Sequence, residues 1–409
     1  MKRLPLTGIR VLDLSRILAA PLAAQSLGDL GAEVIKIERP GRGDEARRWG
    51  PPFLKDKEGR DTREAPMYLS ANRNKRSITI DLSSSEGQAL VRSLVETSDV
   101  FIENYKVGDL QRYGLDYESL KLVNPRLIYC SVTGFGQTGP YSKQPGYDTV
   151  FQAMSGLMSV TGLPDGVPGG GPMKTGPSLA DFMAGQFATA GVLAALYERD
   201  THSGEGVHID IALLDSTIAA QTHSLATYLA TGNVPPRRGT EGNGGLPSQA
   251  FACRDRSIIV ICGSEDQYRE FCEVLGHPEL ASDPRFITNS DRLRHRRELA
   301  ETFGAIISEW ASDDLLAALG AVGIPSGPVN TYPEVFANPQ VQHRGLTLTA
   351  EHAQAGPTRF YGNPIRFVGI DDRAPMAPPV LGQHTEELLR ELFGMSDIEI
   401  AGLRERAII

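Results

Sequence analysis

The 409 residues include 41% hydrophobic and 22% charged residues, a balance that excludes a largely disordered chain. The formal net charge of −9 argues against a general nucleic-acid binder. Four cysteines without a Cys-x-x-Cys pair are typical of a reducing compartment. We find neither a signal peptide nor an apolar stretch of membrane-spanning length, and therefore expect a cytoplasmic protein without a membrane partner.

Strand and helix signals alternate in the first part of the chain. Short apolar runs predict strands, and apolar residues spaced three or four apart predict helices between them. In chain order we expect strands at 9–14, 32–38, 77–82, 100–103 and 127–132, with helices beginning at Pro21 and spanning 85–98 and 116–123. Alternation of this kind predicts a parallel sheet with helices on both faces.

Two stretches rich in helix breakers divide the rest of the chain. The first, 133–178, is rich in Gly and Pro and precedes a strong helix predicted over 179–199. Irregular stretches of that length are usually functional or disordered. The second, 231–247, predicts a domain boundary. We expect the first part of a large domain at 1–231, a small domain at 232–330, and a return segment at 331–409 with a strand at 365–368.

Common enzyme signatures are absent or incomplete. Residues 134–139 match the dinucleotide-binding pattern Gly-x-Gly-x-x-Gly, but Pro140 follows at once, so no helix opens there to bind a pyrophosphate. The sequence contains no Gly-x-Ser-x-Gly, no phosphate-binding loop and no His-Glu-x-x-His, and its histidines show no metal-site spacing. A Rossmann dehydrogenase, a serine hydrolase and a metal site are therefore disfavoured.

Basic residues gather near the start of an otherwise acidic chain. Residues 72–76, Asn-Arg-Asn-Lys-Arg, directly precede a predicted strand, and the turn at 39–44 contains two further arginines. Such clusters suit phosphate oxygens, because Arg binds them bidentately and Lys acts as a point charge. The structural alternative is a solvated basic turn, which the cluster alone favours.

One carboxylate stands at the start of the helix predicted over 179–199. Ser178-Leu-Ala-Asp181 matches a capping-box variant, with Ser178 as N-cap and Asp181 at the third helical position. The local sequence alone favours this structural role. In the functional alternative, the helix amides keep the Asp181 carboxylate ionised and able to attack, and help to hold an oxyanion beside it.

Several segments carry a family resemblance through their order and spacing. They are GIRVLD at 8–13, GAEVIKIE at 31–38, NKRS at 74–77, ENY at 103–105, SVTGFGQTGP at 131–140, PGYD at 145–148, and DPRF at 283–286 with Asn289 and Arg292. Together they cover nearly the whole chain. The sequence resembles the class III CoA-transferases, the family of formyl-CoA transferase and carnitine CoA-transferase.

The resemblance implies that Asp181 is a catalytic nucleophile. In this scheme the carboxylate attacks an acyl-CoA thioester to give a mixed anhydride and CoA thiolate, and the thiolate returns to give an aspartyl-CoA thioester. An acceptor carboxylic acid then takes the CoA. CoA is a co-substrate, and neither a permanently bound cofactor nor a metal is expected. Arg and Lys near the site suggest a short dicarboxylate pair, such as succinyl-CoA and a related acid.

The same resemblance implies a set of binding residues. Those expected to line the CoA site are Leu18, Ala19, Arg39, Asn72, Arg73, Asn74, Lys75, Asn104, Tyr105, Lys106 and Arg112. Gln137, Gly244 and Gly245 are expected beside the reacting acyl group, the two glycines within a guarding loop at 242–245. The alternative for that loop is a plain linker.

Some residues depart from the pattern of formyl-CoA transferase. Leu18 replaces a glutamine, Thr133 replaces a lysine, and 242–245 lacks an uninterrupted glycine run, so formyl-CoA and oxalate are disfavoured as substrates. The family also contains α-methylacyl-CoA racemases, and an acyl-CoA racemase or isomerase is the alternative activity. Their histidine occurs in Gly-His-Asp, where this chain has Tyr147, whose pKa is poorly matched to that role.

The resemblance finally implies an architecture. We expect an α/β protein with a Rossmann-like large domain containing the parallel sheet, a smaller α+β domain, and an interlocked homodimer. Its expected partners are an acyl-CoA, a carboxylic acid and a second copy of the chain, without nucleic acid. A non-catalytic CoA-binding protein is the remaining alternative.

Overall fold

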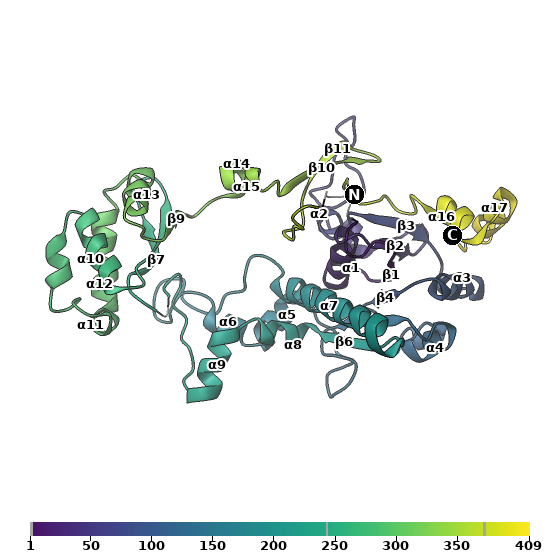
Figure 1. Cartoon of the computed structure of the whole chain (residues 1–409), viewed down its shortest axis with the longest axis horizontal. Helices are drawn as coiled ribbons and strands as arrows, with labels where there is room; N and C mark the ends of the chain where they lie inside the picture. The colour runs from purple at the N-terminus through teal and green to yellow at the C-terminus, as the bar shows by residue number, and fades with distance from the viewer. Residues whose placement is uncertain (1–2, 243, 371–373) are drawn as a thin grey trace. The chain divides into compact units, whose positions relative to one another are not determined.

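The computed structural model describes residues 3–242, 244–370 and 374–409. Contacts divide the chain into two compact units. The first unit consists of Met1–Met158, Lys174–Val234 and Arg344–Ile409, and the second consists of Ser159–Met173 and Pro235–His343. Figure 1 shows the elements of the first unit mainly in purple, teal and yellow, and those of the second mainly in green.

The first unit is built on a parallel six-stranded sheet with the strand order β3-β2-β1-β4-β5-β6. Its strands are β1 (Arg10–Asp13), β2 (Glu33–Glu38), β3 (Lys75–Thr79), β4 (Val100–Glu103), β5 (Ile128–Thr133) and β6 (His208–Ala212). The chain adds β2 and β3 on one side of β1, and then β4 to β6 on the other. The direction of winding therefore changes between β1 and β4.

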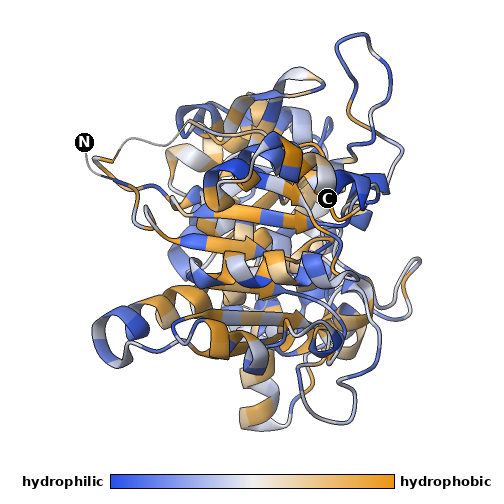
Figure 2. Ribbon diagram, turned by 90° about the vertical axis from the view of Figure 1, so that its right-hand side faces the viewer, coloured by the Kyte–Doolittle hydropathy of each residue, from blue (hydrophilic) through white to orange (hydrophobic). Residues whose placement is uncertain are grey.

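Helices cover both faces of this sheet. One face carries α1 (Ala19–Asp29) and α7 (Leu179–Glu198), and the other carries α3 (Ser85–Glu96), α4 (Tyr117–Val123), α16 (Thr385–Phe393) and α17 (Asp397–Glu405). Neighbouring side chains such as Val11 and Leu12 point to opposite faces and join separate cores. Figure 2 shows the apolar strands in orange in the middle of the unit. The predicted α/β class and the doubly covered parallel sheet are confirmed.

Short elements complete the first unit. They are α2 (Pro66–Leu69), α5 (Asp148–Met154), α8 (Leu213–Ala219), α9 (Thr222–Thr231), β10 (Thr347–His352) and β11 (Gly356–Tyr361), with brief turns of helix at Glu45–Arg48, Gln111–Tyr113 and Arg199–Ser203. The short helix α6 (Leu157–Val160) begins in the first unit and ends in the second. The prediction of a strand at 365–368 is wrong. The strands in this region are β10 and β11, which pair with each other as an antiparallel hairpin, whereas 365–368 is irregular.

Helix α7 is long and packs closely on α1. A Cβ atom at Gly185 would lie 2.8 Å from the Ala19 carbonyl oxygen, so glycine permits this approach of the two helices. By length and composition alone, Leu179–Ser203 passes the test for a membrane-spanning helix. The expectation that no apolar stretch reaches that length was therefore wrong. One side of α7, including Ala184, Ala188 and Val192, is buried in the core that it shares with the sheet.

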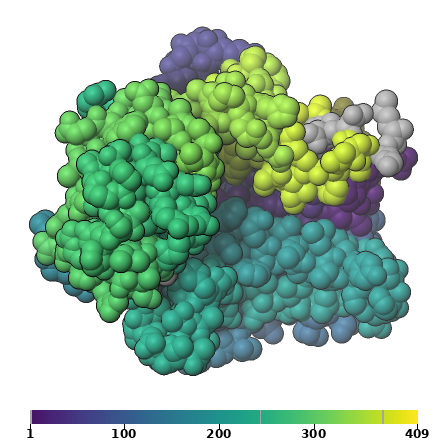
Figure 3. Space-filling view, turned by 60° about the vertical axis from the view of Figure 1, so that its left-hand side comes forward, coloured from purple at the N-terminus to yellow at the C-terminus, as the bar shows by residue number. Residues whose placement is uncertain are grey.

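The second unit has its own sheet and core. Its strands β7 (Ser248–Ala252), β8 (Ser257–Ile261) and β9 (Ser326–Pro328) form an antiparallel sheet, and its helices are α10 (Glu265–Val274), α11 (Asn289–Arg294), α12 (Arg296–Ile307), α13 (Ser312–Ala321), α14 (Tyr332–Ala337) and α15 (Pro339–His343), with a turn of helix at Pro278–Ser282. Apolar side chains such as Phe271 and Phe303 form the core. Figure 3 shows the unit as a closely packed group of green atoms.

A buried ion network connects β1, β2 and β3. Lys75 Nζ lies 2.8 Å from Asp13 Oδ2, and Lys36 Nζ lies 3.1 Å from Asp44 Oδ2, with all four side chains fully buried. Burial raises the pKa of the Asp13 carboxyl, but Lys36 and Lys75 outweigh burial and hold this pKa below its ordinary value. Asp13 ends β1, so the network fixes the start of the loop that follows this strand.

Removing one member of this network is expected to destabilise the fold. Lys75→Met leaves the Asp13 carboxylate without its closest cation, and we expect the free energy of unfolding to fall by about 3–5 kcal/mol in urea titrations. Lys55→Met, which breaks an ion pair to Asp61 with both side chains more than half exposed, is the control and should change it by less than about 1 kcal/mol. Equal effects of the two substitutions would contradict a structural role of Lys75.

Candidate active site

A large cavity of the first unit lies at the carboxyl ends of the parallel strands. It has a volume of about 620 Å³, and its walls include Leu18 after β1, Asn104 after β4 and Thr133 at the end of β5. The strand order changes direction between β1 and β4, and open α/β sheets bind ligands in the crevice at such a point. The topology therefore designates this cavity, the acyl pocket, as the candidate site.

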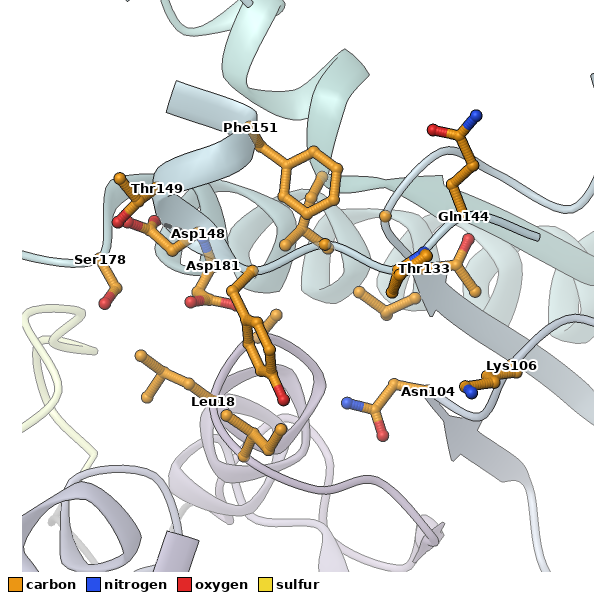
Figure 4. A pocket seen from close by; sticks show the side chains of 18 of the residues that line it. Leu18, Asn104, Lys106, Thr133, Gln144, Asp148, Thr149, Phe151, Ser178 and Asp181 are labelled. Carbon is orange, nitrogen blue, oxygen red and sulfur yellow. Dashed lines mark hydrogen bonds between the residues drawn. The ribbon is translucent and has the colours of Figure 1, made fainter. Parts of the chain in front are cut away.

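Asp181 lies in the acyl pocket, in the first turn of α7. Figure 4 shows its carboxylate beside Asp148, with Ser178 and Thr149 on the same side and Asn104 and Lys106 on the opposite side. In the part of the chain that the structure describes, no donor is hydrogen-bonded to the Asp181 carboxylate. This carboxylate is therefore free to act on a ligand in the pocket.

The start of α7 is capped by Asp148 and not by Ser178. Asp148 Oδ1 accepts hydrogen bonds from the backbone N–H of Ala180 at 2.8 Å and of Asp181 at 3.4 Å, and its Oδ2 accepts one from Gln152 at 2.6 Å. The Ser178 side chain makes no capping hydrogen bond, so the predicted capping box is wrong. The amides that were expected to keep Asp181 ionised are bonded to Asp148 instead.

The protonation of Asp181 follows from this arrangement. Burial raises the pKa of the Asp181 carboxyl to about 7, and the neighbouring carboxylate of Asp148 adds to the rise. A carboxylate whose pKa is near 7 and that accepts no hydrogen bonds is more basic than a carboxylate bonded to backbone amides. It is therefore also the better nucleophile. Perturbed carboxyls in clefts are typical of catalytic sites.

A second cavity, the basic pocket, shares Tyr105 with the acyl pocket. It has a volume of about 550 Å³, and Arg16, Arg39, Arg42 and Arg48 are among its lining residues. Arg16 stacks over the Tyr105 ring at 4.6 Å and pairs with Glu45, whereas Arg39 and Arg42 form no ion pair with a described residue. Unpaired guanidinium groups are suited to phosphate oxygens. A ligand with a phosphorylated end and a reactive end could thus occupy both pockets.

Comparisons with known proteins agree with this site. Residues 6–385 match CoA-transferase family III. The chain belongs to this family. It is 44% identical to a succinate–glutarate CoA-transferase from Agrobacterium fabrum, covering 95% of this chain and 96% of that protein. It is 39% identical to succinyl-CoA:glutarate CoA-transferase from Homo sapiens, covering 99% of this chain and 90% of that protein.

A solved structure supports the same assignment. A CaiB/BaiF family protein from Brucella suis matches with a TM-score of 0.86 and 42% sequence identity, covering 96% of this chain and 100% of that one. The comparisons confirm the predicted family. They also confirm the prediction of a class III CoA-transferase that uses CoA as a co-substrate.

The structure brings about half of the predicted CoA-site residues together. Leu18, Ala19, Asn104, Tyr105 and Lys106 line the acyl pocket, and Arg39 lines the basic pocket. The sequence prediction did not include Arg16, Arg48 or Ser83 of the basic pocket. Ser83 follows β3, and the position of a residue just after a parallel strand was a signal that could have indicated it.

Other predicted CoA-site residues lie outside both pockets. Asn72, Arg73 and Lys75 are buried, Arg73 and Asn74 are bonded to Asp29, and Lys75 is bonded to Asp13. The charges of Arg73 and Lys75 are thus neutralised within the protein, which supports structural roles for these two residues. Arg112 lies over the Tyr113 ring at 4.6 Å and lines neither pocket.

The residues predicted beside the acyl group are also dispersed. Gln137 lines a separate small cavity, and its backbone N–H donates to Asp210 at 2.9 Å. Gly244 and Gly245 belong to the second unit, and residue 243 of their loop lies outside the described residues. Their place beside the reacting group stays a prediction.

The lining of the acyl pocket bears on the racemase alternative. Tyr147 lines the pocket and packs edge-on against Trp49, with ring centroids 6.4 Å apart. Among the described residues, no histidine lines this pocket. The described lining of this cavity thus contains the carboxylate of Asp181 but no histidine for a proton transfer at the α carbon.

The pH dependence of catalysis is expected to depend on Asp148. The family resemblance implies that the ionised form of Asp181 is the nucleophile, so we expect kcat/KM for the acyl-CoA to rise with pH through about 7 in the native enzyme. Asp148→Asn keeps an acceptor oxygen for the α7 amides but removes the like charge, which lowers the pKa of Asp181. We expect the rising limb to move down by about one pH unit.

The matched control is Asp397→Asn, which removes an exposed carboxylate from α17. Its pH profile should coincide with that of the native enzyme. Coincidence of the Asp148→Asn profile with the native one would contradict the electrostatic role of Asp148.

Proposed function

We propose that this enzyme transfers CoA from succinyl-CoA to another short dicarboxylate such as glutarate, with Asp181 as the nucleophile. The observation that carries the mechanism is a partly buried carboxylate without a hydrogen-bond donor from the described residues, in a cavity at the switch point of the sheet. The names of the relatives, which pair succinate or succinyl-CoA with glutarate, support the substrate pair.

The first half of the reaction releases the donor acid. An oxygen of the Asp181 carboxylate attacks the thioester carbonyl carbon, the C–S bond breaks, and CoA leaves as the thiolate. The thiolate then attacks the aspartyl carbonyl of the mixed anhydride. The donor leaves as a free carboxylate that carries the bridging oxygen, and Asp181 becomes an aspartyl-CoA thioester.

The second half repeats these steps in reverse. The acceptor carboxylate attacks the aspartyl thioester, which gives a second anhydride and CoA thiolate. The thiolate attacks the acceptor carbonyl, so the new acyl-CoA forms and the Asp181 carboxylate is restored. Each thioester that breaks is replaced by another, and the main hazard is hydrolysis of the anhydride, so water must be kept away from Asp181.

The two pockets support the way CoA is bound in this proposal. The nucleotide end would lie among Arg39, Arg42 and Arg48 of the basic pocket. The pantetheine arm would pass Tyr105, which both pockets share, and Asn104, so that the thioester reaches Asp181. Of the residues first expected to bind CoA, those buried at 72–75 would instead support the floor of the site.

Substitution of the nucleophile tests the proposal. Asp181→Asn should lower succinyl-CoA:glutarate transfer by about 10⁴-fold or more, because the amide is not a competent nucleophile, while CoA still binds in calorimetry. Asp215→Asn is the matched control, since Asp215 also lies in the first turn of a helix, α8. It should retain transfer activity.

Two outcomes would overturn the proposal. Normal turnover by Asp181→Asn would contradict the mechanism, and failure of the native enzyme to use any dicarboxylate pair would contradict the substrates. Uptake of α-deuterium from deuterated water without an acceptor acid would favour the racemase alternative.

We also propose that the enzyme acts as a homodimer. Phe182, Phe187 and Tyr197 on one side of α7 are 48%, 41% and 67% exposed, which is unusual for large apolar residues of a core helix. A second copy of the chain would cover this side. The interlocking of the two copies and the cytoplasmic location stay predictions.

Light scattering tests the dimer. The native protein should have twice the mass of one chain, and Phe187→Glu should raise the monomer fraction because it places a charge in the covered face. Leu122→Glu, which alters an 86% exposed residue of α4, is the control and should remain dimeric. A native monomer at micromolar concentration would contradict the proposal.

A further inference from the structure

The acyl pocket contains three lysines whose charge is not neutralised by any acidic residue that the structure describes. Lys106, Lys143 and Lys174 line the cavity, and none of them forms an ion pair with a described Asp or Glu. Among the described residues, Lys174 Nζ donates to the carbonyl oxygens of Thr175 at 3.0 Å and Gly176 at 3.2 Å and to no other acceptor. Since carbonyl groups carry no net charge, the ammonium remains available to a ligand carboxylate.

Lys106 and Lys174 occupy different parts of the pocket. Lys106 follows Tyr105, the residue shared with the basic pocket, and Figure 4 shows it on the side opposite Ser178. Lys174 belongs to the segment that leads into α7. The next residue, Thr175, donates from its backbone N–H to Gln152 at 2.9 Å, and Gln152 donates to Asp148. Lys174 is therefore tied to the Asp148 side of the pocket.

This placement separates the roles of the lysines. In the proposed binding mode, CoA that enters from the basic pocket would pass Lys106, a lining residue next to Tyr105, before its thioester reaches Asp181. The acyl group must extend beyond the thioester, away from the pantetheine arm and toward the start of α7. Lys174 is fixed by its neighbours at that end of the pocket, whereas Lys106 lies next to the shared Tyr105.

Electrostatics gives a reason for a cation at this end. The walls already contain the carboxylates of Asp148 and Asp181, and the burial of the site strengthens their repulsion of another anion. A dicarboxylate acceptor brings one carboxylate to Asp181 and places its second carboxylate at the distal end of the acyl chain, within the same pocket. A monocarboxylate brings no second charge and has no need of a cation there.

We propose that Lys174 binds the distal carboxylate of the acyl group and thereby selects dicarboxylates over monocarboxylates. This inference rests on the proposed function and specifies how the site recognises its acids. The ammonium exchanges its two carbonyl partners for a charge-assisted hydrogen bond to the ligand. Lys174 is a specificity residue and takes no part in the covalent steps.

The test compares glutarate with its monomethyl ester, which has the same chain but no distal charge, as acceptors from succinyl-CoA. Lys174→Met should lower kcat/KM for glutarate by about 10- to 100-fold and leave that for the ester unchanged. Lys174→Arg keeps the charge and is the matched control, with the native preference expected. In a double-displacement mechanism, kcat/KM for the acceptor does not depend on the donor. Any effect of the substitution on the use of succinyl-CoA therefore leaves the ratio of kcat/KM for glutarate to that for the ester unchanged.

Charge reversal gives a second readout. Lys174→Glu should reduce glutarate use further than Lys174→Met and should increase transfer to γ-trimethylammoniobutyrate, whose distal charge is positive. Lys174 is exposed, so both variants are expected to fold, with thermal unfolding as the check.

The outcomes separate this inference from the proposed function. An unchanged glutarate-to-ester ratio in Lys174→Met, or an equal loss for both acceptors, would overturn the role of Lys174 while dicarboxylate transfer stands. Absence of any dicarboxylate transfer in the native enzyme would overturn both.

Discussion

The backbone amides at the start of α7 are hydrogen-bonded to Asp148 and not to Asp181. The protonation of the Asp181 carboxyl depends on this arrangement. An acidic residue in the first turn of a helix is ordinarily stabilised as an anion by those amides. Here Asp148 occupies them, so Asp181 is left with burial and a like charge, and both raise its pKa. A carboxylate that merely capped the helix would be a poorer nucleophile. In the proposed mechanism, Asp148 therefore both caps the helix and keeps Asp181 reactive.

In the proposed mechanism, the sheet determines where Asp181 meets its substrate. The loops after β1 and β4 diverge at the point where the winding direction changes, and this leaves room for the acyl pocket. The same loops border the basic pocket, with Tyr105 common to both. Beneath them, the buried pair of Lys75 and Asp13 fixes the end of β1. Both pockets thus lie along the carboxyl edge of one sheet. This arrangement would bind and orient the two ends of a long ligand such as an acyl-CoA.

Local patterns in the sequence predicted what depends on local physics. Buried strands such as β1 and β5 follow from short apolar runs, and the conspicuous position of Asp181 follows from the start of a strong helix. Contacts between distant segments were not predictable in this way. Nothing near Ser178 indicates that Asp148 is the cap, and nothing near Lys75 indicates that its charge is neutralised by Asp13, because both partnerships form only when the sheet is assembled.

Transfer of oxygen from the acceptor to Asp181 is the most direct test of the account. When the acceptor acid carries heavy oxygen in both carboxylate positions, the second anhydride contains one of these atoms as its bridge. Cleavage at the acceptor carbonyl then leaves that atom on Asp181. Mass spectrometry of the peptide containing Asp181 after turnover with labelled glutarate should therefore show incorporated heavy oxygen. Proven turnover without label at Asp181, or with label on another residue, would contradict covalent catalysis by this carboxylate.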